Sequence, residues 1–138
     1  MRRVARSVMQ AEGCPQNAQV SIFFCANKRI RTLNRNWRGL DAPTDVLSFP
    51  QEEPAQAGIN YDRGKARKSP PVLLGDVIIS VETAARQAKS AGISLAEEMD
   101  FLLVHGLLHL LGWDDATAVK RRRMLKRQEE ILGSVQTQ

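Results

Sequence analysis

The chain is organised around the stretch Val104-His105-Gly106-Leu107-Leu108-His109-Leu110-Leu111-Gly112-Trp113-Asp114-Asp115. This stretch contains both histidines of the protein, His105 and His109, at a spacing of four residues. On an α-helix, residues at this spacing lie on one face, with Cβ atoms about 5–6 Å apart. Because a zinc–nitrogen bond is only about 2 Å long, both imidazoles could bind one ion. Gly112 predicts the end of the helix, beyond which Asp114 or Asp115 could supply a third ligand.

A purely structural interpretation of the same residues is also open. A histidine on an apolar helix is commonly a core residue with a satisfied hydrogen bond, and an aspartate before a helix is commonly its N-cap. The pairing of the histidines favours a metal site, because burying two unpartnered imidazoles among leucines would cost about 1–3 kcal/mol each. A metal ion with a carboxylate ligand would remove that cost.

Length and composition indicate one compact domain spanning residues 1–138. The apolar fraction of 43% and the charged fraction of 25% are typical of a soluble globular protein. We expect a cytoplasmic protein without a membrane partner, because no apolar run is long enough to span a bilayer and no signal-peptide core follows the N-terminus. The formal charge of +5 favours a polyanionic partner.

Hydrophobic periodicity predicts an α+β fold, with a small mixed β-sheet packed by helices and the histidine helix at its centre. The predicted helices span residues 2–12, 27–36, 81–91, 94–111 and 116–132, and the predicted strands span residues 19–25, 45–49 and 72–80. Asn27, Ser80 and Ser94 are the expected N-caps, the last with Glu97 in a capping box. Residues 72–80 are apolar enough for a central strand covered on both faces.

Two connections stand out between these elements. Residues 37–44 form a polar, turn-rich connection that contains Arg38. Residues 51–71 form a long loop with a basic run at Arg63, Lys65, Arg67 and Lys68. Loops of this length in compact domains are usually functional or disordered. The basic run is expected to be solvated, and an RNA contact is the alternative.

The residues between the histidines argue against a peptidase. Zincin peptidases carry His-Glu-x-x-His, in which the glutamate takes a proton from the attacking water. Gly106 stands in that place here, so the chain would lack the general base. Three protein ligands and one open position still suffice to acidify a bound water, whereas structural zinc sites are closed by four ligands, usually with several cysteines. We therefore expect an open, catalytic site formed by His105, His109 and a carboxylate.

Three motifs, in order, resemble the signatures of the YbeY family of bacterial rRNA maturation endoribonucleases. The first runs from Leu33-Asn34 through Trp37-Arg38 to Pro43-Thr44-Asp45-Val46-Leu47-Ser48-Phe49-Pro50, the second is Leu74-Gly75-Asp76-Val77-Ile78-Ile79-Ser80, and the third is the histidine stretch itself. Their order and spacing agree from about Val20 to Leu132, which is most of the chain.

The resemblance implies a zinc-dependent, single-strand-specific endoribonuclease that matures the 3′ end of small-subunit rRNA and takes part in ribosome quality control. It implies one Zn²⁺ per chain, with His105 and His109 as the first two ligands. Arg38 becomes the catalytic, phosphate-facing arginine, which stabilises charge as a metal-activated water attacks the phosphodiester. The expected partners are single-stranded RNA, the small ribosomal subunit and its assembly factors, and the expected oligomeric state is a monomer.

The sequence departs from the family pattern in three places. Asp115 stands where the family has its third histidine ligand, and Trp113 stands where a tyrosine is usual. Aspartate can bind zinc, but its charge makes the ion a weaker Lewis acid, and Asp115 could instead cap the last helix. The family usually also has a strand before the first helix, so the sheet is expected to lack an edge strand, unless translation starts further upstream.

Two other functions remain open at this point. A ribosome-binding or RNA-binding assembly factor could keep the fold and the basic surface while the change at Asp115 weakens catalysis. A metallopeptidase would share the histidine spacing but is disfavoured by Gly106.

Overall fold

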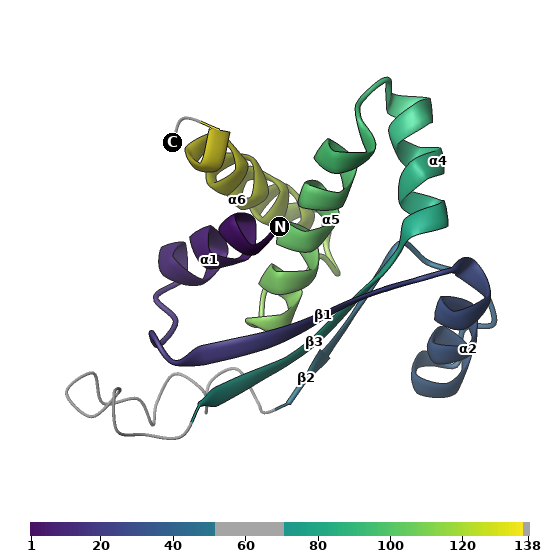
Figure 1. The fold of residues 1–138 in the computed structure, drawn as a ribbon, viewed down its shortest axis with the longest axis horizontal. Helices are drawn as coiled ribbons and strands as arrows, with labels where there is room; N and C mark the ends of the chain where they lie inside the picture. Colours follow the sequence, from purple (N-terminus) through teal and green to yellow (C-terminus); the bar gives the residue numbers. More distant parts are fainter. Residues whose placement is uncertain (52–70, 137–138) are drawn as a thin grey trace.

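In a computed structural model of the protein, residues 1–51 and 71–136 are described. Their elements, in chain order, are α1 (Arg2–Ala11), β1 (Ala18–Cys25), α2 (Asn27–Arg38), β2 (Val46–Pro50), β3 (Val72–Ser80), α4 (Val81–Ala91), α5 (Leu95–Leu110) and α6 (Ala118–Gln136). The fold is α+β, as predicted (Figure 1). The predicted basic run at Arg63, Lys65, Arg67 and Lys68 lies outside the described residues. No helix in the described ranges combines the length and the apolar character needed to cross a membrane.

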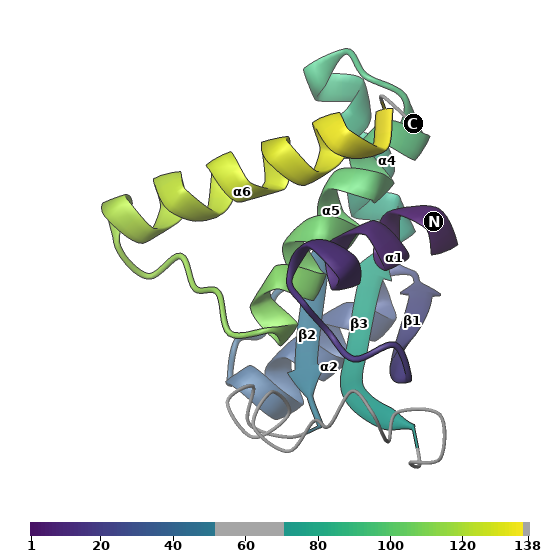
Figure 2. The same ribbon diagram turned by 90° about the vertical axis from the view of Figure 1, so that its left-hand side faces the viewer.

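Strand β3 is the centre of a three-stranded mixed sheet in the order β1-β3-β2. It pairs with β1 in parallel and with β2 antiparallel. Val77 and Ile79 of β3 are fully buried beneath the helices, but Leu73 near the start of the strand is about half exposed. The expectation that β3 is covered on both faces is therefore wrong for its first half, because α2 covers only part of the second face (Figure 2).

Helix α5 lies against the sheet and forms the centre of the core. It begins at the predicted capping box, in which the Ser94 hydroxyl accepts from the Glu97 backbone N–H and the Glu97 carboxylate accepts from the Ser94 N–H. Its leucines at 103, 107 and 108 are fully buried. Helices α1 and α6 pack against α5 and against each other on the side away from the sheet (Figure 2). An apolar helix covered on nearly all sides is the arrangement predicted from its composition.

Gly106 is the point where α5 comes closest to the sheet. A Cβ atom at this position would lie 2.7 Å from Val77 Cγ1 and 2.9 Å from Val46 Cγ2. The Ser48 hydroxyl of β2 donates a 2.7 Å hydrogen bond to the Gly106 carbonyl oxygen. The backbone of α5 therefore lies directly on side chains of the sheet here, and a larger residue would have to displace them.

The start of α2 differs from the prediction. Asn27 is the first residue of the helix and not its N-cap, which is Ala26 without a side-chain hydrogen bond. The Asn27 amide oxygen instead accepts from the hydroxyls of Ser80 and Thr83, at the junction of β3 and α4. The Glu82 carboxylate accepts from the Asn27 backbone N–H at 2.9 Å. A cap from another helix thus replaces the local one, because β1 and β3 end side by side.

Replacing Gly106 by alanine should lower the free energy of unfolding by about 1–3 kcal/mol, because the added methyl overlaps two valine side chains. Gly133→Ala in α6 is the matched control, since no atom lies within 4 Å of its Cβ position. It should stabilise the protein by about 0.5–1 kcal/mol through helix propensity. Urea unfolding followed by circular dichroism measures both values. Equal effects of the two substitutions would contradict the close packing at Gly106.

Candidate metal centre

Three side chains direct their ligand atoms toward one point. His105 Nε2 and His109 Nε2 are 3.1 Å apart, and Asp115 Oδ2 lies 3.5 Å from His109 Nε2 and 3.9 Å from His105 Nε2. Ligands that hold zinc tetrahedrally at about 2.0–2.2 Å are themselves about 3.3–3.5 Å apart. The three donors therefore fit one small divalent ion with little movement, and they form the one such group found in the described ranges.

The two histidines belong to the last two turns of α5, at the predicted helical spacing. Their side chains are 25% and 29% exposed, so each is partly accessible to solvent. The ring centroids are 4.6 Å apart with the planes inclined at 73°. This partial exposure leaves room for a ligand that does not come from the protein, which is the property of an open site.

Burial lowers the pKa of His109, and the neighbouring His105 lowers it further. The carboxylate of Asp115 and a hydrogen bond to the Trp113 backbone act in the opposite direction. Because the pKa of His109 lies below the ordinary pKa of histidine, its imidazole is neutral at neutral pH. A neutral imidazole is the form that binds a metal.

Of the two candidate aspartates, Asp115 and not Asp114 faces the histidines. Asp114 accepts from the Ala116 N–H and pairs with Lys120 Nζ at 3.1 Å. The predicted capping role of Asp115 is not seen, because Thr117 accepts from the Lys120 N–H and α6 begins at Ala118 rather than at residue 116.

Contacts of Trp113 hold the loop between α5 and α6 against α1. The indole N–H of Trp113 donates to the Glu12 carboxylate at the end of α1, and Arg127 of α6 pairs with the same carboxylate at 3.0 Å. Gly112, with φ of 103°, permits the chain to turn after α5. The carboxylate of Asp115 is thus carried by a loop that contacts both α1 and α6.

Arg38 lies in the same cleft as the histidines but on a helix. The expected connection at residues 37–44 is shorter than predicted, because α2 continues through Arg38 and ends at Gly39, which has φ of 72°. The cleft has a volume of about 410 Å³. Its lining residues are Arg38, Thr44, Asp45, Val46, Leu47, Ser48, Pro50, His105, His109 and Asp115. Three elements distant in sequence therefore contribute to one cavity.

Two contacts hold the end of α2 in place beside the cleft. Asn34 is buried, and its amide nitrogen donates to the Ala42 carbonyl at 2.9 Å, which fixes the connection after the helix. Trp37 packs edge-to-face on Phe49 of β2, with ring centroids 6.1 Å apart. Arg38 itself is exposed, so its guanidinium is accessible to a ligand in the cleft.

Sequence reasoning did not identify Gln128. This residue of α6 is 2% exposed, and its amide oxygen lies 3.3 Å from His105 Nδ1. No local pattern distinguishes it, because it is one polar residue on a highly charged helix.

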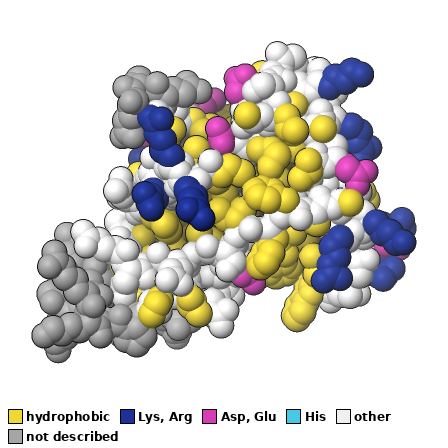
Figure 3. Space-filling view, viewed as in Figure 1, with side chains coloured by type: hydrophobic (Ala, Val, Ile, Leu, Met, Phe, Trp, Pro, Cys, Tyr) yellow, Lys and Arg dark blue, Asp and Glu magenta, His cyan; other side chains and the backbone are white. Residues whose placement is uncertain are grey.

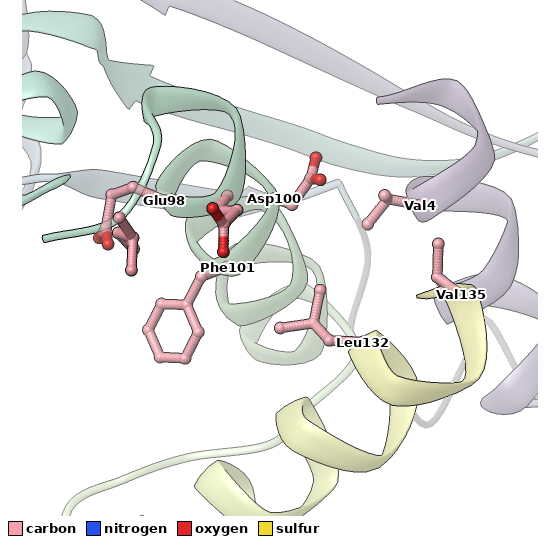
Figure 4. A pocket seen from close by; sticks show the side chains of 8 residues that line it. Val4, Glu98, Asp100, Phe101, Leu132 and Val135 are labelled. Carbon is pink, nitrogen blue, oxygen red and sulfur yellow. The ribbon is translucent and has the colours of Figure 1, made fainter. Parts of the chain in front are cut away.

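A second hollow, of about 330 Å³, is lined by apolar residues of α1, α5 and α6 together with the carboxylates of Glu97, Glu98 and Asp100 (Figure 4). Burial raises the pKa of Glu98 and of Asp100. This hollow has no histidine in its lining, and its side chains include Phe101 and Leu132. It is less suited to a metal ion than the histidine cleft.

Comparison with known proteins shows which family the chain belongs to. The family model described as "Endoribonuclease YbeY" matches residues 1–136. The chain belongs to the YbeY family. It is 46% identical over 132 residues to the endoribonuclease YbeY of Geobacillus thermodenitrificans, covering 96% of this chain and 82% of that protein. It is 48% identical over 140 residues to that of Moorella thermoacetica, covering 98% and 84%.

A solved structure shows the same fold at low sequence identity. The solution structure of a Thermotoga maritima protein matches 97% of this chain and 79% of its own chain, with a TM-score of 0.60 and 20% identity. The resemblance of the three motifs to the YbeY family is therefore confirmed, and so is the α+β architecture. The roles of the individual cleft residues stay predictions.

Asp115→Ala should weaken metal binding by more than about 100-fold, because it removes one of three candidate ligands, and losing a group that only hydrogen-bonds to a ligand already costs about 10–100-fold. Asp114→Ala is the matched control and should bind metal as the unmodified protein does, because its carboxylate contacts Lys120 instead. Competition with a chromophoric chelator measures both affinities. Equal losses in the two variants would show that the loop, and not the Asp115 carboxylate, matters.

Proposed function

We propose that this YbeY family member is a metal-dependent endoribonuclease that cleaves single-stranded RNA. The observation that carries this proposal is the convergence of His105, His109 and Asp115 with Arg38 in one open cleft. The related proteins from Geobacillus and Moorella are named endoribonucleases. By the same family resemblance, the proposed substrate is the 3′ end of small-subunit rRNA, and the proposed setting is ribosome maturation and quality control in the cytoplasm.

Four cleft residues have proposed roles, three as metal ligands and one as a phosphate-binding group. His105, His109 and Asp115 would hold one divalent ion, for which zinc is the proposed identity because two imidazoles and a carboxylate suit it. When bound, this ion supplies Lewis acidity that makes a water molecule a better nucleophile at neutral pH. Arg38 would bind the non-bridging oxygens of the phosphate, because a guanidinium matches them in a bidentate manner. As water adds to phosphorus and a P–O bond breaks, Arg38 stabilises the growing negative charge.

The packing of α5 supports RNA over a peptide as the substrate. In zincin peptidases a glutamate follows the first histidine, and here that position is Gly106, which contacts Val77 and Val46 of the sheet. A glutamate side chain has no space there. The cleft thus lacks the general base of a peptidase at that position, whereas it offers a cation beside the proposed ion.

The charge around the cleft also favours a polyanion. Helix α2, which ends at Arg38, carries Lys28, Arg29, Arg31 and Arg35 as well. Lys and Arg side chains gather over this helix at the lower right of Figure 3. One of them, Arg31, is paired with Asp41 at 2.8 Å. Such a surface would attract single-stranded RNA and guide its backbone toward the cleft.

Arg38→Ala and His109→Ala should each reduce the cleavage rate of a fluorescent single-stranded RNA, by about 100–1,000-fold for Arg38. Arg86→Ala is the matched control, because Arg86 is an exposed arginine of α4 outside the cleft. It should cleave at nearly the unmodified rate. The protein is loaded with Zn²⁺ and assayed at fixed ionic strength. Equal cleavage by all variants would point to a contaminating nuclease and contradict the proposal.

Asp115 itself favours one alternative, a binding factor that assembles with RNA without cleaving it. A carboxylate ligand lowers the positive charge of the centre relative to a third histidine, and this weakens attraction for phosphate. A factor of this kind would bind RNA with a steep salt dependence, and chelation of metal would not release it. Filter binding with and without a chelator, run beside the cleavage assay, separates the two functions.

A further inference from the structure

Gln128 contacts the candidate metal centre from the side opposite to the cleft. Its amide oxygen lies 3.3 Å from Nδ1 of His105, while Nε2 of the same ring faces His109 and Asp115. The two ring nitrogens of His105 thus point to different partners. A polar side chain that is 98% buried, by its exposed fraction of 2%, is unusual on a helix whose other polar residues are mostly exposed.

The buried neighbours of Gln128 on α6 are apolar and offer its amide no hydrogen bond. Met124 and Ile131, one turn before and one turn after it, are buried apolar residues of the core. Its amide nitrogen has no hydrogen-bond partner among the described residues. An apolar residue would avoid this unsatisfied donor. Within the described part of the chain, the contact with His105 is the one side-chain hydrogen bond of Gln128.

An amide oxygen is an acceptor, so it selects a single form of the neutral histidine. His105 can donate to it only with its proton on Nδ1. That leaves a lone pair on Nε2, the atom that faces His109 and Asp115. With the proton on Nε2 instead, the ring could not bind an ion in the cleft. Partners of this kind commonly set the tautomer and the orientation of metal-binding histidines.

We propose that Gln128 is a positioning residue, which holds His105 as the Nδ1–H tautomer with Nε2 free to bind the metal. This inference rests on the metal centre proposed above. Gln128 acts through His105 and does not touch the substrate, because α6 places it behind the ring and outside the lining of the cleft.

The neutral charge of Gln128 is part of the proposal. Asp115 already places one negative charge in the centre, so a divalent ion there leaves a net charge of +1. A glutamate at position 128 would accept the same hydrogen bond but would reduce that net charge to zero. The ion would bind at least as tightly, whereas the centre would attract a phosphate less. An amide thus orients the histidine without further weakening the attraction for RNA.

Two variants separate orientation from charge. Gln128→Met keeps a similar length without an acceptor, and Gln128→Glu keeps the acceptor and adds charge. Ile131→Val is the matched control, because it alters a buried apolar residue of the same helix, whose side chain cannot form a hydrogen bond with His105. Circular dichroism establishes that each variant is folded before it is compared.

The first measurement is the tautomer of His105 in the metal-free protein, read from ¹⁵N chemical shifts and long-range ¹H–¹⁵N correlations. We expect Nδ1–H in the unmodified protein, in Gln128→Glu and in Ile131→Val, and loss of this preference in Gln128→Met. A purely structural role for Gln128 would not alter the tautomer. Finding the proton on Nε2 of His105 in the unmodified protein would overturn the proposal, even if Gln128→Met failed to fold.

The second measurement is the affinity for Zn²⁺, by competition with a chromophoric chelator. Gln128→Met should bind about 10–100-fold more weakly, whereas Gln128→Glu and Ile131→Val should bind at least as tightly as the unmodified protein. Gln128→Glu should nevertheless cleave single-stranded RNA more slowly when fully loaded. If the unmodified protein bound no metal, the proposed function itself would fail. If it bound metal and Gln128→Met bound equally well, only the role of Gln128 would fail.

Discussion

The close contact between α5 and the sheet at Gly106 is the constraint on which the rest of the structure depends. Without a side chain at this position, the helix approaches Val77 and Val46 until a backbone carbonyl accepts a hydrogen bond from Ser48. The histidines on either side of Gly106 in sequence are thereby held at the edge of β2. The cleft exists because that edge, the end of α2 and the end of α5 are forced into proximity.

The same contact separates this protein chemically from peptidases with the same histidine spacing. The place of a general base is taken by helix–sheet packing, so the proposed chemistry relies on an ion and on groups from other elements instead. Arg38 offers positive charge from α2, Asp115 offers a carboxylate from the loop before α6, and Gln128 contacts His105 from α6 itself. Each of these groups is positioned by a different element, and under the proposed function together they keep the centre positively charged toward a phosphate.

Contacts between the two ends of the chain stabilise this arrangement. Glu12 receives the indole N–H of Trp113 and the guanidinium of Arg127, across sequence separations of 101 and 115 residues. The loop that carries Asp115 is therefore tied to α1 and α6 rather than free in solvent. A preorganised carboxylate loses less conformational freedom when it binds an ion, so a fastened loop favours metal binding.

The sequence by itself determined the features that depend on residues close together in the chain, which are the bounds of β3, the capping box at Ser94 and the histidine spacing. Its three motifs also determined that the chain belongs to the YbeY family. Only the tertiary structure decided that Asn27 bonds to Ser80 and Thr83, that Asp115 rather than Asp114 faces the histidines, and that Gln128 contacts His105. The physical reason is that helix propensity, caps and periodicity act over a few residues, whereas these contacts join residues that only chain folding brings together.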